Sequence, residues 1–151
     1  MTKLMAAALF AACLATPMAS LAQDSAAQDS AAQDAATPLH ETVTPAASAL
    51  ISNLPGKRLV SAVVDYPPGA ASLPHRHAAS AFIYAYVLSG EIRSAVDGAP
   101  ARIYRAGEGW FEQPGAHHTV SENASRTQPA RLLAVFIVDE KDKTLTTPDP
   151  H

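Results

Sequence analysis

Two short segments of the chain carry histidines whose spacing suits the binding of a metal ion. His75 and His77 stand two residues apart, and the adjacent pair His117 and His118 follows the turn at residues 113–115, Gln-Pro-Gly. Because side chains on a strand alternate between its faces, His75 and His77 are expected to share one face. A third imidazole from another strand would complete a site. We therefore expect one divalent metal ion, with zinc, iron, manganese, nickel and copper all left open.

The regions around these histidines read as short β-strands separated by glycine and proline turns. Asp97-Gly98 predicts a hairpin, because a type I′ turn needs positive φ at both central residues. Residues 40–53 are ambiguous: Pro45 interrupts them, and 46–51 fits either a helical turn or a strand. No segment has a convincing helical period, so we expect an all-β barrel or sandwich. The expected strands are residues 57–65, 81–88, 91–96, 101–105, 109–113, 116–121 and 130–139.

The first 22 residues have the pattern of an export signal. Lys3 precedes the apolar run 4–14, which is too short to span a bilayer, and small residues precede a cleavage point after Ala22. We therefore expect residues 1–22 to be a signal peptide and the mature protein to be periplasmic or secreted. A lipid anchor at Cys13 is a weaker alternative, since the residues before it only loosely match a lipobox.

The barrel is expected over residues 39–141. The regions on either side of it have simple compositions. Residues 23–38 contain three tandem copies of a five-residue unit that has no aromatic side chain. Such a segment buries too little apolar surface to offset its ordering entropy, so we expect a disordered linker or tether. The polar residues 142–151 are expected to form a flexible tail. A formal net charge of −3 without a basic run predicts no nucleic-acid partner, and no stable membrane span is expected after signal cleavage.

Two motifs in this order resemble those of the cupin superfamily. The first is Gly69, His75-x-His77 and Gly90, and the second is Gly107, residues 113–115 and His118. The resemblance covers roughly residues 59–139. It implies a single jelly-roll β-barrel with a metal held inside by His75, His77 and His118, and it selects His118 over His117 as the third ligand.

The first motif departs from the family pattern at residues 78–83, which contain no acid. At this place cupins carry a glutamate that completes the metal site. Three imidazoles leave positions open for water or substrate, and they leave the ion its full double charge. The nearest acid that could replace the missing one is Glu112. It could reach the metal, orient an imidazole or act as a catalytic base; otherwise it is a surface residue at the barrel mouth. Tyr84, Tyr86 and Trp110 are candidates for the substrate pocket.

Three functions fit these residues. The first is a metal-dependent enzyme that acts on a small molecule, a dioxygenase-like oxidoreductase in which Glu112 is the candidate base. The second is a binding module for a small ligand or a metal, without turnover. The third is a sugar isomerase or epimerase, for which the motifs offer few acid–base residues. Small cupins commonly pair through an edge strand, so a homodimer is also expected.

Overall fold

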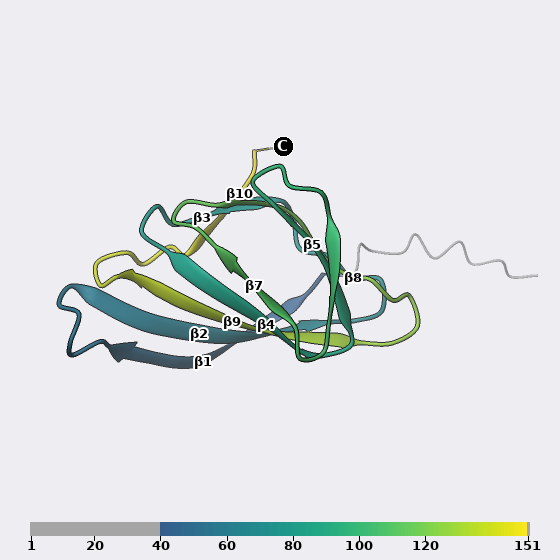
Figure 1. Cartoon of the computed structure of the whole chain (residues 1–151), viewed down its shortest axis with the longest axis horizontal. Coiled ribbons are helices and arrows are strands. Elements are labelled where there is room, and N and C mark those ends of the chain that lie inside the picture. The colour runs from purple at the N-terminus through teal and green to yellow at the C-terminus, as the bar shows by residue number, and fades with distance from the viewer. Residues whose placement is uncertain (1–39, 151) are drawn as a thin grey trace, which may run out of the picture. The chain divides into compact units, whose positions relative to one another are not determined.

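The computed structural model describes residues 40–150, which form two five-stranded sheets (Figure 1). The structure does not describe the signal peptide expected at 1–22 or the linker expected at 23–38. The strands are β1 Thr42–Leu50, β2 Lys57–Tyr66, β3 His75–His77, β4 Phe82–Ser89, β5 Glu91–Val96, β6 Arg102–Arg105, β7 Gly109–Glu112, β8 His117–Asn123, β9 Ala130–Asp139 and β10 Thr146–Pro148.

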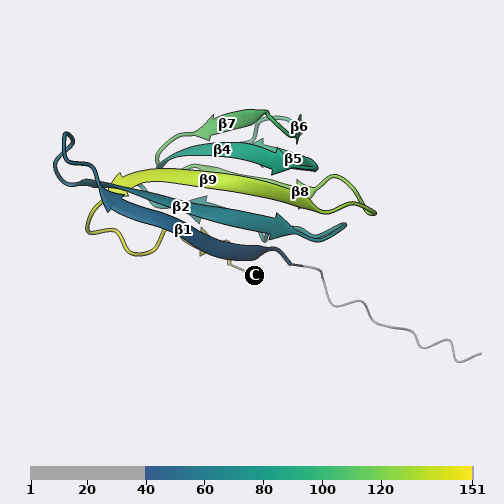
Figure 2. The ribbon, with the colours of Figure 1, turned by 90° about the horizontal axis from the view of Figure 1, so that it is seen from below.

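The two sheets are antiparallel and form the two layers of a barrel. One has the strand order β1-β2-β9-β4-β7 and the other β10-β3-β8-β5-β6. Figure 2 shows the first sheet from its outer side, with β7 and β1 at its edges. The described residues contain no helix, and hence none that could cross a membrane. The expected all-β barrel is therefore confirmed, and its seven expected strands are found with ends that lie no more than two residues from the expected ones.

The core lies between the sheets, and β4 shows how the alternation fills it. Ile83, Ala85 and Val87 are buried, whereas Phe82, Tyr84 and Tyr86 on the other face are half-buried. Because strand side chains repeat every second residue, one face of β4 belongs to the barrel interior and the other to the outer surface. The inner residues join the following buried side chains of the core: Val64, Tyr66, Ile92, Trp110, Leu132, Ala134, Phe136 and Val138.

Of two further segments, the sequence left one open between a helical turn and a strand, and the structure shows a strand; the other differs from the expectation. Residues 42–50 form one continuous strand, β1, which pairs with β2 through an irregularity between Pro45 and Ala47. That irregularity accommodates Pro45, which has no N–H to donate to the ladder. The C-terminal residues, expected to be a flexible tail from 142, instead include β10, which pairs with β3. The expectation of a flexible tail is wrong for residues 146–148, because this pairing satisfies their backbone groups.

Turns occur where positive φ was expected. Asp97 has a φ of 52° and Gly98 a φ of 75°, as the hairpin between β5 and β6 requires. Gly90, between β4 and β5, also has a positive φ, of 72°. A Cβ at Gly90 would lie 2.6 Å from the Pro129 carbonyl oxygen and 2.8 Å from the Ala130 Cα, so this position excludes any side chain on two grounds.

We expect Gly90→Ala to destabilise the fold more than Gly98→Ala. Both replacements place a Cβ on a left-handed residue, which costs roughly 1–2 kcal/mol, but a Cβ at Gly98 meets open space. The clash at Gly90 adds about 1–3 kcal/mol of overpacking. Urea unfolding of the two variants and the wild type measures the difference. Equal free energies of unfolding for the two variants would contradict the close approach of β9 to Gly90.

Candidate metal centre

The three motif histidines come from two neighbouring strands of the second sheet. β3 is only three residues long, and it places His75 and His77 towards the interior and Arg76 outwards, where it is exposed. β3 pairs with β8 so that His75 lies directly opposite His118. This register brings a residue from the first motif and a residue from the second side by side.

The imidazoles form one cluster. The ring centroids are 4.8 Å apart for His75 and His77, 5.2 Å for His75 and His118, and 6.0 Å for His77 and His118. Each ring offers one nitrogen such that the three atoms lie within 4.8 Å of one another. Zinc–nitrogen bonds of about 2.0–2.1 Å put two bound nitrogens at most about 4.2 Å apart, so the rings need to close by a few tenths of an ångström to surround a single ion.

Hydrogen bonds fix the orientation of two of the rings. His75 Nδ1 lies 2.7 Å from the Leu73 carbonyl oxygen, and that oxygen can only accept, so the proton is on Nδ1. The unprotonated Nε2 of His75 is therefore free to bind a metal. Ser94 Oγ lies 2.9 Å from Nε2 of His118, a residue that is 4% exposed. A ligating histidine is commonly oriented by such a contact at its other ring nitrogen.

An extra residue in β8 brings His118 to this position. Val96 pairs with His118 and Ala95 with Val120, so Thr119 has no partner on β5. Such a bulge shifts the alternation by one residue. As a result His118 and Ser121, an odd number of residues apart, are both buried.

Glu112 is buried beside the histidine cluster and is 2% exposed. Its Oε2 lies 3.0 Å from His77 Nε2, its Oε1 lies 3.4 Å from His118 Nδ1, and Trp110 Nε1 donates to Oε1 at 3.0 Å. Trp110 and Glu112 share a face of β7, as their spacing predicts. The alternative in which Glu112 is a surface residue is therefore wrong, because that face of β7 points inwards.

The contact between Glu112 and His77 is close but is not a hydrogen bond. Both nitrogens of His77 and Oε2 of Glu112 are buried without a hydrogen-bond partner among residues 40–150. Buried polar atoms are normally paired. The unpaired atoms include a carboxylate oxygen and an imidazole nitrogen only 3.0 Å apart, a donor set that fits a divalent cation.

The protonation of these groups also suits a cation. Burial alone raises the pKa of the Glu112 carboxyl, but the adjacent His77 and His118 rings and the Trp110 N–H bring that pKa below its ordinary value. Burial lowers the pKa of His75, and it lowers the pKa of His118 to about 4. Metal ligands must be deprotonated. At neutral pH Glu112 is therefore a carboxylate, and His75 and His118 are neutral.

The other histidine of the pair, His117, faces away from the cluster. Its Nε2 lies 2.7 Å from Asp149 Oδ2, and its Nδ1 lies 3.3 Å from a guanidinium nitrogen of Arg76. The motif-based choice of His118 over His117 agrees with this placement. His117 instead links β8 to the residue that follows β10.

The cluster lies in a cavity of about 320 Å³ between the two sheets. Such a volume is at the lower end of the usual range for small-molecule sites. Most of its wall is apolar, and the polar groups are concentrated at a few positions. The cavity is lined by His40, Glu41, Val43, Ala62, Val64, Tyr66, Ser72, Leu73, His75, His77, Ile83, Ala85, Glu112, His118, Ser121, Leu132, Ala134, Phe136, Thr146 and Pro148.

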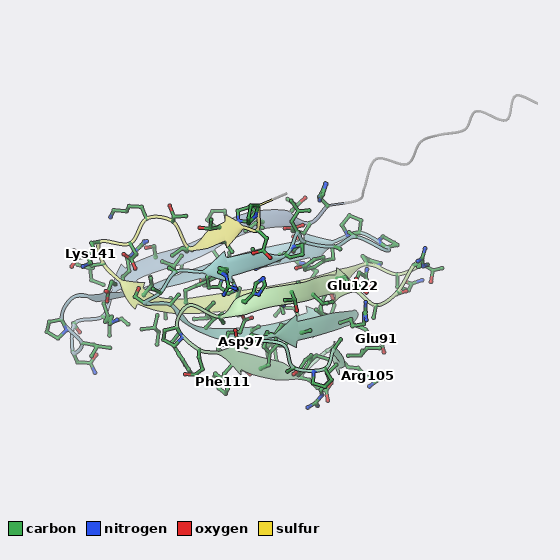
Figure 3. The ribbon with its side chains drawn as sticks, turned by 90° about the horizontal axis from the view of Figure 1, so that it is seen from above. Glu91, Asp97, Arg105, Phe111, Glu122 and Lys141 are labelled. Carbon is green, nitrogen blue, oxygen red and sulfur yellow. The ribbon has the colours of Figure 1, made fainter. Side chains whose placement is uncertain are left out.

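The expected pocket residues Tyr84, Tyr86 and Trp110 do not line this cavity. Tyr84 lies on the outer face of β4, where its ring is 4.9 Å from that of Phe111 and 6.1 Å from that of Tyr86. Phe111 is 63% exposed and projects from the edge of the sheet (Figure 3). Ile83 and Ala85 face the cavity instead. Trp110 is buried behind it, where it packs on Tyr104 and orients Glu112.

Several cavity residues were not expected from the sequence. Thr146 and Pro148 reach the cavity because β10 pairs with β3, and no local pattern signals that long-range contact. Tyr66, Ser72 and Ser121 bring hydroxyl groups to the wall. A signal existed for Tyr66 and Ser72, since Tyr66 ends β2 and Ser72 lies between β2 and the first histidine of the motif.

The fold, the motifs and a match to a family model agree on the class of protein. The model described as "Cupin domain" matches residues 62–136, which include every residue of the histidine cluster and Glu112. The chain belongs to the cupin superfamily. It is a metal-binding cupin with a three-histidine cluster. No curated protein gives a match to this chain.

Solved structures with the same fold have diverse descriptions. A recombinant oxalate oxidase in complex with glycolate is 26% identical, with a TM-score of 0.53, over 67% of this chain and 52% of that one. The protein TT1209 from Thermus thermophilus is 26% identical, with a TM-score of 0.52, over 66% and 84%. The cupin domain of Schizosaccharomyces pombe Cnp3, at 17% identity, shares the fold. This chain thus spans only about half of the oxalate oxidase chain.

Without metal, the protein is expected to lose stability as the pH falls from about 6.5 to about 4. In that window His118 takes up a proton in the unfolded chain but not in the folded one, because burial lowers its pKa to about 4. The difference corresponds to roughly 3 kcal/mol at the acid end. Urea unfolding of metal-free wild type and His118→Gln at pH 7 and at pH 4.5 measures this contribution.

The loss between the two pH values should be smaller in His118→Gln than in the wild type. Other groups titrate in both proteins, so the comparison of the two losses isolates His118. An equal loss in the two proteins would show that the His118 ring is not held neutral by the fold.

Proposed function

We propose that this cupin is an exported, metal-dependent oxidoreductase that acts on a small molecule bound through oxygen atoms to the metal. In this proposal His75, His77 and His118 hold the ion and Glu112 supplies the carboxylate that is absent from the first motif. The observation that carries the proposal is the convergence of the imidazoles from one sheet and the unpaired Glu112 Oε2 from the other at one place in a largely apolar cavity. Export rests on residues 1–22 and stays a prediction, as does the homodimer.

Each residue of the centre has a role that its contacts support. The Leu73 carbonyl and Ser94 hydroxyl orient His75 and His118. The Trp110 N–H holds one oxygen of Glu112 and leaves the other directed at His77. A carboxylate beside three imidazoles lowers the net charge of a divalent centre from two to one. The centre would then still attract an anionic or chelating oxygen ligand.

A bound metal ion would supply Lewis acidity and, where it is redox active, electron transfer to dioxygen. The protein contributes the shape and dryness of the site. Ile83, Leu132 and Phe136 line the cavity and keep water away from a bound substrate. The same apolar walls fit a sugar poorly, so the isomerase alternative has less support.

The oxalate oxidase structures support an oxygen ligand of this kind. Two of them hold glycolate, a small 2-hydroxy acid, and are 25–26% identical to this chain. The cavity of about 320 Å³ leaves room for a larger molecule than glycolate. We therefore propose a substrate that chelates the metal as a 2-hydroxy acid, catechol or enol does and carries an apolar body.

The role of Glu112 can be tested by metal affinity. Glu112→Gln keeps the size of the side chain and the acceptor for Trp110 but removes the charge, so we expect metal affinity to fall at least tenfold, as is usual when such groups are changed. Glu108→Gln, on the exposed turn before β7, is the matched control. Equilibrium dialysis against a competing chelator, followed by elemental analysis, gives both values. Equal metal affinities of the wild type and Glu112→Gln would show that Glu112 is not part of the metal centre.

The reaction can be tested by oxygen consumption. Protein loaded in turn with iron, manganese or copper is mixed with 2-hydroxy acids, catechols and flavonols in an oxygen electrode. We expect uptake with at least one substrate class, and its loss in His75→Ala. Tight binding of these compounds without uptake or product, for every metal, would contradict the oxidoreductase and favour the binding module.

A further inference from the structure

The cavity contains a second polar cluster in addition to the histidines and Glu112. Tyr66 Oη lies 2.8 Å from Ser72 Oγ and 2.8 Å from Ser121 Oγ. All three residues line the cavity, and Tyr66 and Ser121 are 2% and 5% exposed. The three hydroxyl groups come from β2, from the segment before β3 and from β8, so the fold has gathered them at one place.

The strand register sets the distance between this hydroxyl cluster and the candidate metal centre. His75 pairs with His118, and the same antiparallel register recurs in the segment before β3, where Ala71 forms an isolated bridge with Glu122 and the Ser72 N–H donates to the Ser121 carbonyl oxygen at 2.9 Å. Ser72 is three residues before His75, and Ser121 is three residues after His118. At about 3.3 Å per residue, the hydroxyl cluster lies roughly 10 Å along the sheet from the histidines.

The hydroxyl cluster has one proton that its internal hydrogen bonds do not use. Three hydroxyl groups carry three protons, and the two hydrogen bonds among them use two. Neither Ser72 Oγ nor Ser121 Oγ has another hydrogen-bond partner among residues 40–150. Burial raises the pKa of the Tyr66 phenol, so this hydroxyl keeps its proton. The remaining proton is available to an acceptor inside the cavity.

We propose that Tyr66, Ser72 and Ser121 form a second subsite that donates a hydrogen bond to an acceptor oxygen of the substrate. The inference rests on the proposed function, because it places the other end of the same molecule on the metal. It narrows the substrate class to molecules with three parts: chelating oxygens at one end, an apolar body, and a carbonyl, carboxylate or ether oxygen roughly 10 Å away. Val64, Leu132 and Ala134 belong to the cavity wall and are suited to contact that apolar body.

The experiment uses two series of 2-hydroxy acids and the zinc-loaded full chain, since zinc allows binding without redox turnover. One series ends in a methyl ketone, and the other ends in an isopropenyl group of the same shape that accepts no hydrogen bond. Calorimetric titration gives the dissociation constants over increasing chain length. At the chain length that spans the two sites, we expect the ketone to bind about three- to tenfold more tightly than its partner, the usual worth of one hydrogen bond.

The variant is Tyr66→Phe/Ser72→Ala/Ser121→Ala, because any smaller change leaves a hydroxyl proton free. Replacing the whole network by apolar groups of similar shape is often nearly neutral for stability. In this variant the ketone and its partner should bind equally, while zinc affinity stays unchanged. Ser61→Ala, which removes a buried serine that does not line the cavity, is the control and should keep the preference.

Two results would overturn the subsite and leave the metal centre standing. One is equal binding of ketone and partner at every chain length in zinc-loaded wild type. The other is a ketone preference that survives in the triple variant, in which case the hydroxyl groups only hold Ser72 against β8. Failure of the wild type to bind zinc would overturn the proposed function and the subsite with it. A crystal structure of the zinc–ketone complex tests the same contact without any variant, and a ketone oxygen beyond hydrogen-bond reach of all three hydroxyls would refute it.

Discussion

The burial of the Glu112 carboxylate is the constraint on which the site depends. An ionised carboxylate that is 2% exposed destabilises a fold strongly unless nearby groups compensate its charge. Trp110 satisfies one of its oxygens, and the other faces His77 without an aligned hydrogen bond. A cation held between Glu112 and the imidazoles would remove this penalty. A local arrangement that is costly for folding and favourable for binding is typical of functional sites.

The rest of the barrel delivers the groups that surround this carboxylate. β7 presents Glu112 from one sheet, and β3 and β8 present the histidines from the other. β3 is short, and its free edge is covered by β10. The chain before β10 is anchored in turn, since Arg58 donates to the Asp142 carbonyl oxygen at 2.6 Å and Ser80 donates to the Asp142 carboxylate at 2.7 Å. The C-terminal segment is therefore part of the wall of the site and not an appendage to the barrel.

Features of the site that depend on the side-chain alternation within one strand could be predicted from the sequence. Features that depend on contacts between distant segments could not. The alternation in β3 predicts that His75 and its neighbour two residues on share a face, and the second motif identified His118. Tyr84 and Tyr86 share one face of β4, but the alternation of that strand does not show which face is inside, because Ile83 on the other face is also large enough for a core. The unpaired Thr119 and the pairing of β10 depend on contacts across the sheet, and no local pattern encodes them.

The central claim is that one metal ion is held by three imidazoles and the Glu112 carboxylate. The most direct test is X-ray absorption spectroscopy of the full-length protein, at the edge of the metal that copurifies with it. The account predicts outer-shell scattering from three imidazole rings and a first shell that loses one oxygen donor in Glu112→Gln. A spectrum without imidazole scattering, or one that Glu112→Gln leaves unchanged, would contradict it.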